Sequence, residues 1–394
     1  MGPKTIVFLK HFASLEKFPP SIASITNVVD GTTVYQKQTI PPAASCAKLF
    51  AIQDVPGYLN MKMDPNVDFL QYRTITTQQT YVIDLDGYSD IGEYLEKHLG
   101  AKSRSSLRRY KKKLESCFSI HSHTYYGNID RTQYDTLFEN LRDLMTRRFE
   151  QKKEQNYELQ HLEEIKRDIY PKICQKQASI FVIHADGSPI SIRINLMKGK
   201  LAYYLLSAFD PDFEIFRIGK LDMWYNINWM MDHGYEKYDL LKGYGYIKKR
   251  WSDSVYPNNL VFVNHDGSLL GQIKFFLMFY RVTVWLDMVR VLKQLRLHQI
   301  VKSWKKNGLG IKKKETTPLL PISCETDLEI DAYPLGKFPD NKELRNSIFT
   351  LAYKHSFPVN SIKVSQKKDD PRQFLITIGD NCYLFSFVKN NSIG

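Results

Sequence analysis

The chain has 394 residues, of which 43% are hydrophobic and 13% aromatic, so it can bury a sizeable core in two or three domains. No apolar run reaches the ~20 residues that a membrane-spanning helix needs, and the N-terminus lacks the core of a signal peptide. These features exclude a membrane-spanning class and predict a cytoplasmic protein. The five cysteines are scattered without a CxxC pair, which predicts reduced thiols and neither a disulfide framework nor a zinc site.

The net charge of +13 is concentrated in two stretches. Residues 102–115 contain seven Lys or Arg against one acid, and residues 281–314 contain ten against Asp287 alone. Basic surfaces of this kind attract phosphates, nucleic acid or anionic lipid, and the sequence does not choose among them.

The first third of the chain predicts a strand-rich region followed by helices. Proline and glycine punctuate residues 1–78, which predicts short strands and loops. A strand is expected over residues 80–85, a helix over 88–99, and a second helix over 103–115 with Ser103 as its N-cap. Four cations share the outer face of that second helix, where they are either solvated or hold an anion. They are Arg104, Arg108, Lys111 and Lys112.

Two aspartate pairs have the spacing of a DxD metal motif, but we interpret both as structural because such pairs are common by chance. They are Asp84 with Asp86 and Asp210 with Asp212.

The middle of the chain predicts a strand over 118–125, a long helix over 131–155 and a helical stretch over 162–177. Three strands follow over 178–184, 189–197 and 200–207. The dipeptides Asp186-Gly187 and Lys198-Gly199 between them are hairpin signals, so this region is expected to form an antiparallel meander.

A loop over 210–220 then leads into a helix that ends at Gly234. The loop brings Arg217, Gly219 and Lys220 to the N-terminus of that helix. Free backbone N–H groups and the helix dipole bind phosphate at such a place. The chain lacks the Walker, GxGxxG, HExxH and GxSxG motifs, so the local signatures of nucleotide hydrolysis, dinucleotide binding, zinc proteolysis and serine hydrolysis are missing.

The segment 238–251 begins with a short apolar strand, Tyr238 to Leu241, which Gly243 and Gly245 turn away from the sheet. Three cations then precede an aromatic residue, and they mark either a site for an anionic ligand or a solvated basic turn. They are Lys248, Lys249 and Arg250, followed by Trp251.

A long helix is expected over 269–306, either as a core helix or lying on an anionic membrane with Phe275, Phe276 and Trp285 as anchors. We favour the core helix, because Asp287 and the spread of aromatics leave no clean apolar face. Residues 302–314 are expected to be a linker. The tail predicts a small α/β module with a strand over 327–333, a helix over 341–354 and strands over 361–365 and 374–388.

Two of these segments together resemble a known family. KSRSSLRRYKKKLE, residues 102–115, and YDLLKGYGYIKKRW, residues 238–251, are similar in type and order to the two motifs of the CelD-like branch of the GNAT acyltransferase superfamily. The resemblance covers about residues 80–262. Residues matching the first motif are Leu107, Arg108, Arg109, Leu114 and Glu115, and those matching the second are Asp239, Gly243, Lys248, Arg250 and Trp251.

The resemblance implies an α/β (α+β) fold, with a GNAT-like mixed, mostly antiparallel sheet flanked by helices. The strand over 200–207 should diverge from the strand over 238–241 and so leave a slot for a thioester. The expected organisation is an N-terminal strand and loop part (1–78), the acyltransferase domain (79–265), a basic helix and linker (266–317) and the small α/β module (318–394).

The resemblance also implies an enzyme that moves an acyl group from acyl-CoA to an amine or hydroxyl of a sugar, amino sugar or polyamine, as in envelope polysaccharide metabolism. Acyl-CoA would be a co-substrate, and no tightly bound cofactor or metal is expected. The related Fem-type transferases take aminoacyl-tRNA as the donor. The basic helix adds peripheral contact with an anionic membrane as an alternative partner, and RNA is a less favoured one.

Acyl transfer needs a base for the acceptor's proton and an acid for the departing thiolate. Asp239 is the candidate base, since burial beside a glycine turn can raise its pKa. Tyr244 or Tyr246 is the candidate acid. Substrate contacts are expected from Arg108, Lys248, Arg250 and Trp251, and contacts with the CoA phosphates from Arg217, Gly219 and Lys220.

The chain departs from the family at two places. The tyrosine that the family carries before the lysine is Ile247, with Tyr246 one place earlier. The acidic pair that the family carries after the glycine is replaced by Tyr244 and Gly245. A second hypothesis therefore stays open, in which the protein keeps the fold but binds RNA or anionic lipid without catalysing acyl transfer.

Overall fold

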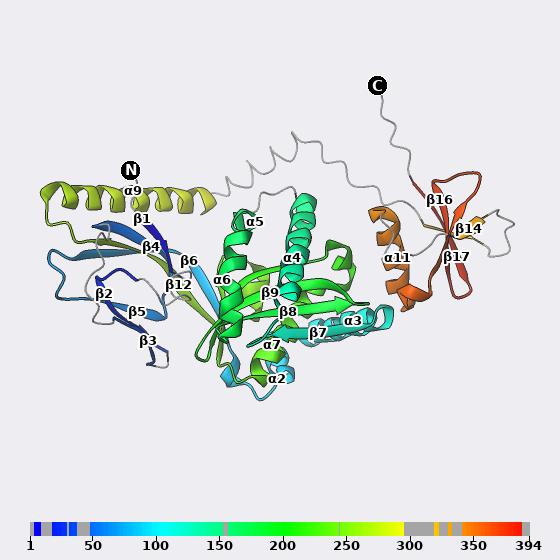
Figure 1. Cartoon of the computed structure of the whole chain (residues 1–394), viewed down its shortest axis with the longest axis horizontal. Helices are drawn as coiled ribbons and strands as arrows, with labels where there is room; N and C mark the ends of the chain where they lie inside the picture. Colours follow the sequence, from blue (N-terminus) through cyan, green and yellow to red (C-terminus); the bar gives the residue numbers. More distant parts are fainter. Residues whose placement is uncertain are drawn as a thin grey trace, which may run out of the picture. The chain divides into compact units, whose positions relative to one another are not determined.

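The computed structural model of the chain describes residues 4–8, 18–29, 31–37, 48–152, 157–243, 245–294, 319–322, 330–332 and 341–387. They belong to two compact units (Figure 1). Unit 1 comprises residues 1–87, 196–204 and 234–311, and unit 2 comprises residues 88–195, 205–233 and 312–394. Each unit is therefore assembled from segments that are far apart in the sequence.

Unit 1 is built on a mixed sheet of long strands. Its strands lie in the order β1 (Lys4–Val7), β4 (Leu49–Pro56), β12 (Ser254–Asn264), β6 (Gln71–Asp84), β11 (Lys237–Lys242) and the first part of β10 (Leu201–Phe209). The pairs β1–β4 and β10–β11 are parallel and the others antiparallel. A smaller antiparallel sheet has the order β3 (Thr33–Gln36), β2 (Ile22–Asn27) and β5 (Leu59–Met63).

The parallel pairing of β10 and β11 is short. It joins Leu201–Tyr203 to Lys237–Asp239 and ends at the Tyr203–Asp239 pair, although β11 continues to Lys242. The predicted divergence of these two strands is therefore confirmed. It coincides with an irregularity in β11, whose register against β6 shifts between Asp239 and Lys242.

Helix α9 (Leu269–Gln294) follows β12 and packs on the unit 1 sheet. Buried Phe275 lies in a cluster with Ala51, Ile75 and Phe262, against which Phe279 and Val282 also pack. The face of α9 that carries Phe275 therefore belongs to the core, as the core-helix prediction requires. No helix in the described ranges has the length and apolarity that are required to cross a bilayer.

Unit 2 carries the predicted meander, because β8 (Ala178–Ala185), β9 (Ser188–Lys198) and β10 are successive neighbours in the sheet, with β7 (Ile120–Tyr125) beyond β8. Asp186 and Gly187 both have positive φ, at 48° and 81°, as a tight two-residue hairpin turn requires. The helices of this unit are α2 (Ile91–His98), α3 (Ala101–Cys117), α4 (Arg131–Lys152), α5 (Tyr157–Gln160), α6 (Leu162–Cys174) and α7 (Ile218–Asp232).

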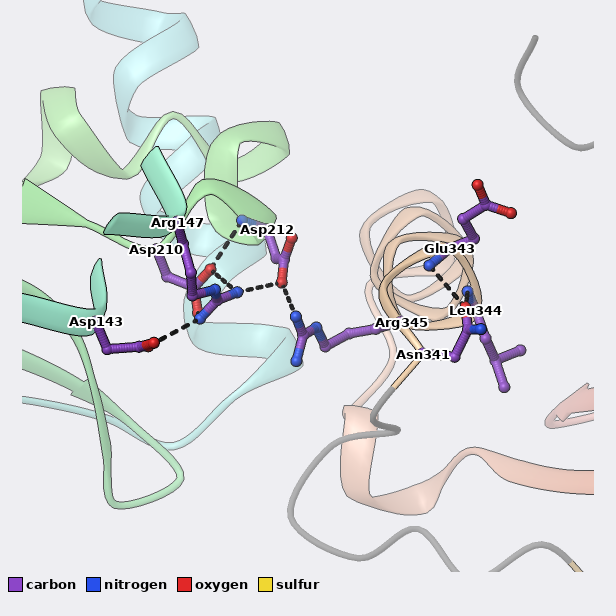
Figure 2. Close-up of polar contacts among 8 residues, drawn as sticks. All are labelled: Asp143, Arg147, Asp210, Asp212, Asn341, Glu343, Leu344 and Arg345. Atoms are coloured by element: carbon purple, nitrogen blue, oxygen red, sulfur yellow. Dashed lines mark hydrogen bonds and ion pairs between the residues drawn. The ribbon is translucent and has the colours of Figure 1, made fainter. Parts of the chain in front are cut away.

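The C-terminal part of unit 2 is a small α/β module, as predicted, but its described sheet has five strands where the sequence predicts three. Its strands lie in the order β13 (Leu320–Ile322), β17 (Asn381–Ser386), β16 (Gln373–Ile378), β15 (Lys363–Lys367) and β14 (Ile330–Ala332), with α11 (Lys342–His355) and the turn η3 (Val359–Ser361). Helix α11 contacts the 3-10 helix η2 (Pro211–Phe216) through Phe349, whose ring centroid lies 5.0 Å from that of Phe213. Figure 2 shows the ion pair between Arg345 and Asp212 that joins α11 to η2.

Some element boundaries differ from those predicted. Helix α3 begins at Ala101 with Gly100 as N-cap, two residues before the expected start at Ser103, because Ala101 and Lys102 are themselves good helix formers. Strand β6 is much longer than the predicted 80–85, since its polar, Thr-rich first half pairs with β12. The strand predicted over 374–388 is a hairpin, because Gly379 takes φ 54° between β16 and β17.

The prediction of five reduced thiols is wrong for Cys382, which is disulfide-bonded. Scattered positions and an odd number of cysteines cannot exclude a single pair. Cys117 and Cys174 are free thiols. Cys46, Cys324 and the predicted linker over 302–314 lie outside the described residues.

Candidate functional site

The N-terminus of α7 in unit 2 is open to a ligand. Arg217 ends η2 and caps α7 in the left-handed conformation, with φ 57° and ψ 39°, and its side chain makes no capping hydrogen bond. The Lys220 N–H donates to the Arg217 carbonyl at 2.8 Å, and the N–H groups before it in α7 precede the first intrahelical acceptor, at the positive end of the helix dipole. This arrangement favours a bound anion.

An open pocket of about 470 Å³ adjoins Arg217. Its lining consists of Tyr110, Glu214, Ile215, Arg217 and Tyr353. Two aromatic rings, an aliphatic side chain and a guanidinium suit an anionic ligand that also carries a flat ring. The sequence prediction found Arg217 but missed the two tyrosines, because α3 and α11 bring them here from distant parts of the chain.

The electrostatics of this pocket are set by arginine. Burial by itself raises the pKa of Tyr110, but hydrogen bonds from Arg217 and Arg109 and the charge of both groups outweigh burial, so the pKa of Tyr110 is lowered. Beside the pocket, the Nζ atom of Lys113 lies 5.4 Å from the Tyr353 ring centroid and donates to Ser356 Oγ at 2.6 Å. The lining itself carries one guanidinium, Arg217, and one carboxylate, Glu214.

The first turn of α7 lies close to an aromatic ring. A Cβ atom added at Gly219 would lie 3.0 Å from Phe209, so only glycine fits there without displacing the ring. The Arg148 guanidinium lies 4.2 Å from the Phe209 ring centroid. Lys220 follows Gly219 and is partly exposed, so Arg217, Gly219 and Lys220 share the start of one helix, as the sequence predicts.

A buried ion pair fixes α7 on the unit 2 sheet. Arg193 of β9 donates through Nε to Asp222 Oδ2 of α7 at 2.8 Å, and Ser191 donates to the other carboxylate oxygen at 3.1 Å. Both charged side chains are almost fully buried. Because these contacts hold the helix in place, its N-terminus has a fixed position.

Asp239 in unit 1 is the centre of a buried hydrogen-bond network. Tyr58 donates to Asp239 Oδ2 at 2.6 Å, and Thr80 donates to Oδ1 at 2.8 Å. The Leu241 N–H also donates to Oδ1, at 2.7 Å. Leu241 has φ 61°, in the left-handed region, where a residue with a side chain is strained. Strained residues at β-bulges are frequent at functional sites.

Burial raises the pKa of Asp239, although the hydrogen bonds from Tyr58, Thr80 and Leu241 and the charge of Lys248 act in the opposite direction. Burial, the neighbouring carboxylate and Tyr203 likewise raise the pKa of Tyr58. A small cavity of about 10 Å³ lies beside the pair, close to the volume that one water molecule needs. Asp239 is 2% exposed, so a proton would reach its carboxylate through Tyr58 or through this cavity.

The predicted cationic cluster forms the short helix α8 (Tyr246–Trp251) in unit 1. Lys248 donates to the Lys242 carbonyl at 2.9 Å, and its Nζ atom lies 5.6 Å from the Tyr204 ring centroid. Arg250 is partly exposed. Trp251 is 3% exposed and belongs to the core. A contact between Trp251 and a substrate stays a prediction. Tyr244 and the side chain of Tyr246 lie outside the described residues.

The outer face of α3 is only partly available. Arg104 pairs with Glu96 and donates to the Leu99 carbonyl at 2.8 Å, and Lys111 pairs with Glu115. Arg108 is exposed on this face.

Aspartates of both DxD pairs form ion pairs with basic side chains. Asp84 pairs with Lys237 at 2.8 Å, and both Asp210 and Asp212 pair with Arg147. These partners agree with the structural interpretation of both pairs. Among the residues that the structure describes, no cluster of His, Cys, Asp and Glu is placed to hold a metal ion.

Residues 101–249 match the sequence family described as "Acetyltransferase (GNAT) domain". This part of the chain is therefore similar to a GNAT-type acetyltransferase domain. The match spans α3 to α8 and includes both the α7 N-terminus and Asp239, but less than half of the chain. It does not separate the CelD-like branch from other GNAT branches. No curated protein matches the chain.

Several solved structures share parts of the fold at low similarity. One is the C-terminal domain (DUF2156) of a lysylphosphatidylglycerol synthetase candidate from Agrobacterium fabrum, with 12% identity, a TM-score of 0.36, and coverage of 57% of this chain and 70% of that one. FemX has 12% identity, a TM-score of 0.38, and coverage of 55% and 72%. L-PGS from Bacillus licheniformis has 11% identity, a TM-score of 0.35, and coverage of 58% and 72%.

Proposed function

We propose that this protein transfers an acyl group from acyl-CoA to an amine or hydroxyl of a small molecule or glycan, such as a sugar, amino sugar or polyamine. The observation that carries the proposal is the uncapped N-terminus of α7 beside the Arg217 pocket, inside the segment that is similar to a GNAT domain. CoA combines phosphates with a flat adenine ring. A helix N-terminus with Arg217 and Lys220 suits the phosphates, and the tyrosines of the pocket suit the ring.

Acyl transfer requires two proton-transferring groups, a base and an acid. The acceptor nitrogen or oxygen attacks the thioester carbonyl, a C–N or C–O bond forms and the C–S bond breaks. The acceptor loses one proton to a base, and the departing thiolate gains one. In the proposal Asp239 is that base, with Tyr58 as the group through which its proton moves, and Tyr244 or Tyr246 protonates the thiolate.

A second donor class is aminoacyl-tRNA, and one observation favours it. The exposed cations Lys102, Arg108, Arg109 and Lys112 lie on α3, the helix that also places Tyr110 in the pocket. A row of exposed cations suits a polyanion larger than CoA. A filter-binding assay with aminoacylated tRNA, compared with calorimetry on CoA, separates the two donors.

The test is the affinity for CoA and acetyl-CoA, measured by calorimetry. The double variant Arg217→Gln and Lys220→Gln keeps the side-chain stems and removes two charges. Charge-assisted contacts of about 1.5–3 kcal/mol predict a 10- to 100-fold loss of affinity. Salt should weaken the wild type more than the variant.

The matched control is Lys363→Gln with Arg372→Gln, which removes two exposed charges from the C-terminal sheet of the same unit. It should leave the affinity unchanged. Equal affinities for CoA in the wild type and the Arg217 variant would contradict a phosphate site at α7. Acyl transfer to a panel of amines and sugars then identifies the acceptor.

A further inference from the structure

Helix α9 of unit 1 is apolar on two opposite faces. Its inner face packs on the sheet through Phe275, Phe279, Val282 and Leu286. In the less favoured membrane alternative of the sequence analysis Phe275 was one of three anchors, but this residue is 1% exposed and belongs to the core, as the favoured core helix requires. The helix is therefore fixed along the sheet, and its outer face needs a separate explanation.

The outer face carries a continuous apolar stripe. Its members recur every three or four residues and are between 46% and 68% exposed: Leu270, Ile273, Leu277, Tyr280, Val284, Met288 and Val291. Trp285 and Phe276 flank the stripe and are 56% and 37% exposed. Scattered exposed apolar residues are ordinary, but a stripe that runs along most of a 26-residue helix marks an interaction surface.

The charges around the stripe are almost all positive. Lys274 and Arg281 are exposed along one edge of it. Asp287 is the single carboxylate in the sequence of α9, and Arg290 donates to it at 2.7 Å. In the sequence, residues 295–314 add seven Lys or Arg and no acid. A partner surface with acidic groups complements this charge.

We propose that α9 docks this protein on the surface of an anionic phospholipid bilayer, with the outer stripe among the acyl chains and Lys274 and Arg281 at the headgroups. Leu, Ile, Val, Tyr and Trp on one face beside cations are the composition of a helix that lies in the membrane interface. Clusters of Lys and Arg next to such a helix add attraction to anionic lipid. The inner face holds the helix parallel to the sheet, so the helix lies on the bilayer and does not cross it.

A second copy of the chain fits this surface less well. Pairing two α9 helices would bring two sets of cations together, and Asp287, already bound to Arg290, is the one carboxylate of the helix that could offset them. The proposal rests on α9 and is independent of the donor and acceptor of the acyl transfer.

The experiment uses the full-length protein and two kinds of vesicle, phosphatidylcholine alone and phosphatidylcholine mixed with phosphatidylglycerol. Flotation should recover the protein with the anionic vesicles, and salt should weaken the binding. Leu277→Ser with Val284→Ser should reduce partitioning by about 10- to 100-fold, because those side chains no longer gain apolar transfer free energy. Lys274→Gln with Arg281→Gln should reduce it about tenfold, on the anionic vesicles only.

The matched control is Val28→Ser with Leu320→Ser, which changes two residues of similar exposure that lie outside α9. It should leave partitioning unchanged. Brominated lipid should quench tryptophan fluorescence in the wild type and much less in Trp285→Phe. The proposal is overturned if the wild type does not float with anionic vesicles. It is also overturned if the protein dimerises and the Leu277 and Val284 changes abolish the dimer without altering flotation.

Discussion

Arg345 of α11 forms an ion pair with Asp212 of η2, whose side chain is 1% exposed (Figure 2). The same carboxylate oxygen accepts a hydrogen bond from Arg147 of α4 at 2.6 Å. Arg147 also donates to both oxygens of Asp210, at 2.8 and 3.0 Å. One buried aspartate thus ties α11, which contributes Tyr353 to the Arg217 pocket, to η2 and α4.

Replacing Asp212 with Asn should destabilise unit 2. The change removes the negative charge from between two guanidinium groups that are mostly buried, and breaking a buried ion pair in this way costs about 3–5 kcal/mol. Urea unfolding should show the loss. Asp370→Asn removes a carboxylate from an exposed pair with Arg372 and should leave the urea midpoint almost unchanged. Equal midpoints for both variants would mean that the Asp212 contacts do not hold α11.

The two glycines of the 238–251 segment should respond differently to alanine. Gly243 has φ 128°, which side-chain-bearing residues rarely adopt, although its nearest neighbour, Lys248 Nζ, is 3.8 Å from an added Cβ. Gly245 has φ −145°, an ordinary extended value, and an added Cβ there makes normal contacts. Gly243→Ala should therefore lower the unfolding free energy by about 1–3 kcal/mol, from backbone strain alone.

Gly245→Ala serves as the control for that experiment and should change the unfolding free energy by less than about 1 kcal/mol. Thermal unfolding of both purified variants checks the contrast. If Gly245→Ala proves the more harmful change, the turn has a different conformation from the one described.

The elements of unit 2 could be predicted from the sequence because their signals are local. The meander follows from dipeptides such as Asp186-Gly187, and α11 begins at Asn341, whose side chain caps the N–H groups of Glu343 and Leu344. Strand β6 was underestimated because its first half is polar on both faces and gains its order from pairing with β12, a segment about 180 residues away.

The candidate sites were predictable only in part. Arg217, Gly219 and Lys220 lie within four residues at a helix start, so their proximity follows from the sequence. Tyr58 and Thr80 reach Asp239 across 181 and 159 residues, and no spacing pattern signals such a contact. The stripe of α9 from Leu270 to Val284 is visible in the sequence, but the helix is apolar on both faces, so the sequence does not show that this face is exposed and that the face with Phe275 packs on the sheet.

Asp239 should make stability depend on pH in a definite direction. Burial raises its folded-state pKa above the ordinary value of 3.8, so the folded protein binds this proton more tightly than the unfolded chain does. The stabilising contribution is fully present below pH 3.8 and is lost as the pH rises through the folded pKa. Asn cannot titrate, so the difference in melting temperature between wild type and Asp239→Asn should shrink as the pH rises.

A series of melting temperatures from acidic to neutral pH tests this sign. Asp370→Asn is the control, because hydrogen bonds from Arg372 lower the pKa of that carboxyl, and its difference from the wild type should not shrink as the pH rises. A difference for Asp239→Asn that grows with pH would show that the Tyr58, Thr80 and Leu241 hydrogen bonds hold the ionised form.

The activity of Asp239→Asn distinguishes a catalytic from a structural carboxylate. If Asp239 accepts the acceptor's proton through Tyr58, acyl transfer should fall by about 100- to 10,000-fold while CoA affinity, set at α7, barely changes. If the carboxylate only anchors Tyr58 and Thr80, the melting temperature should fall and the rate per folded molecule should stay within a few-fold of the wild type. Tyr58→Phe removes the proton path but keeps the ring, so a catalytic role predicts that it loses activity as well. A folded, fully active Asp239→Asn protein would remove Asp239 from the mechanism and leave positioning of the two substrates as the main contribution of the protein.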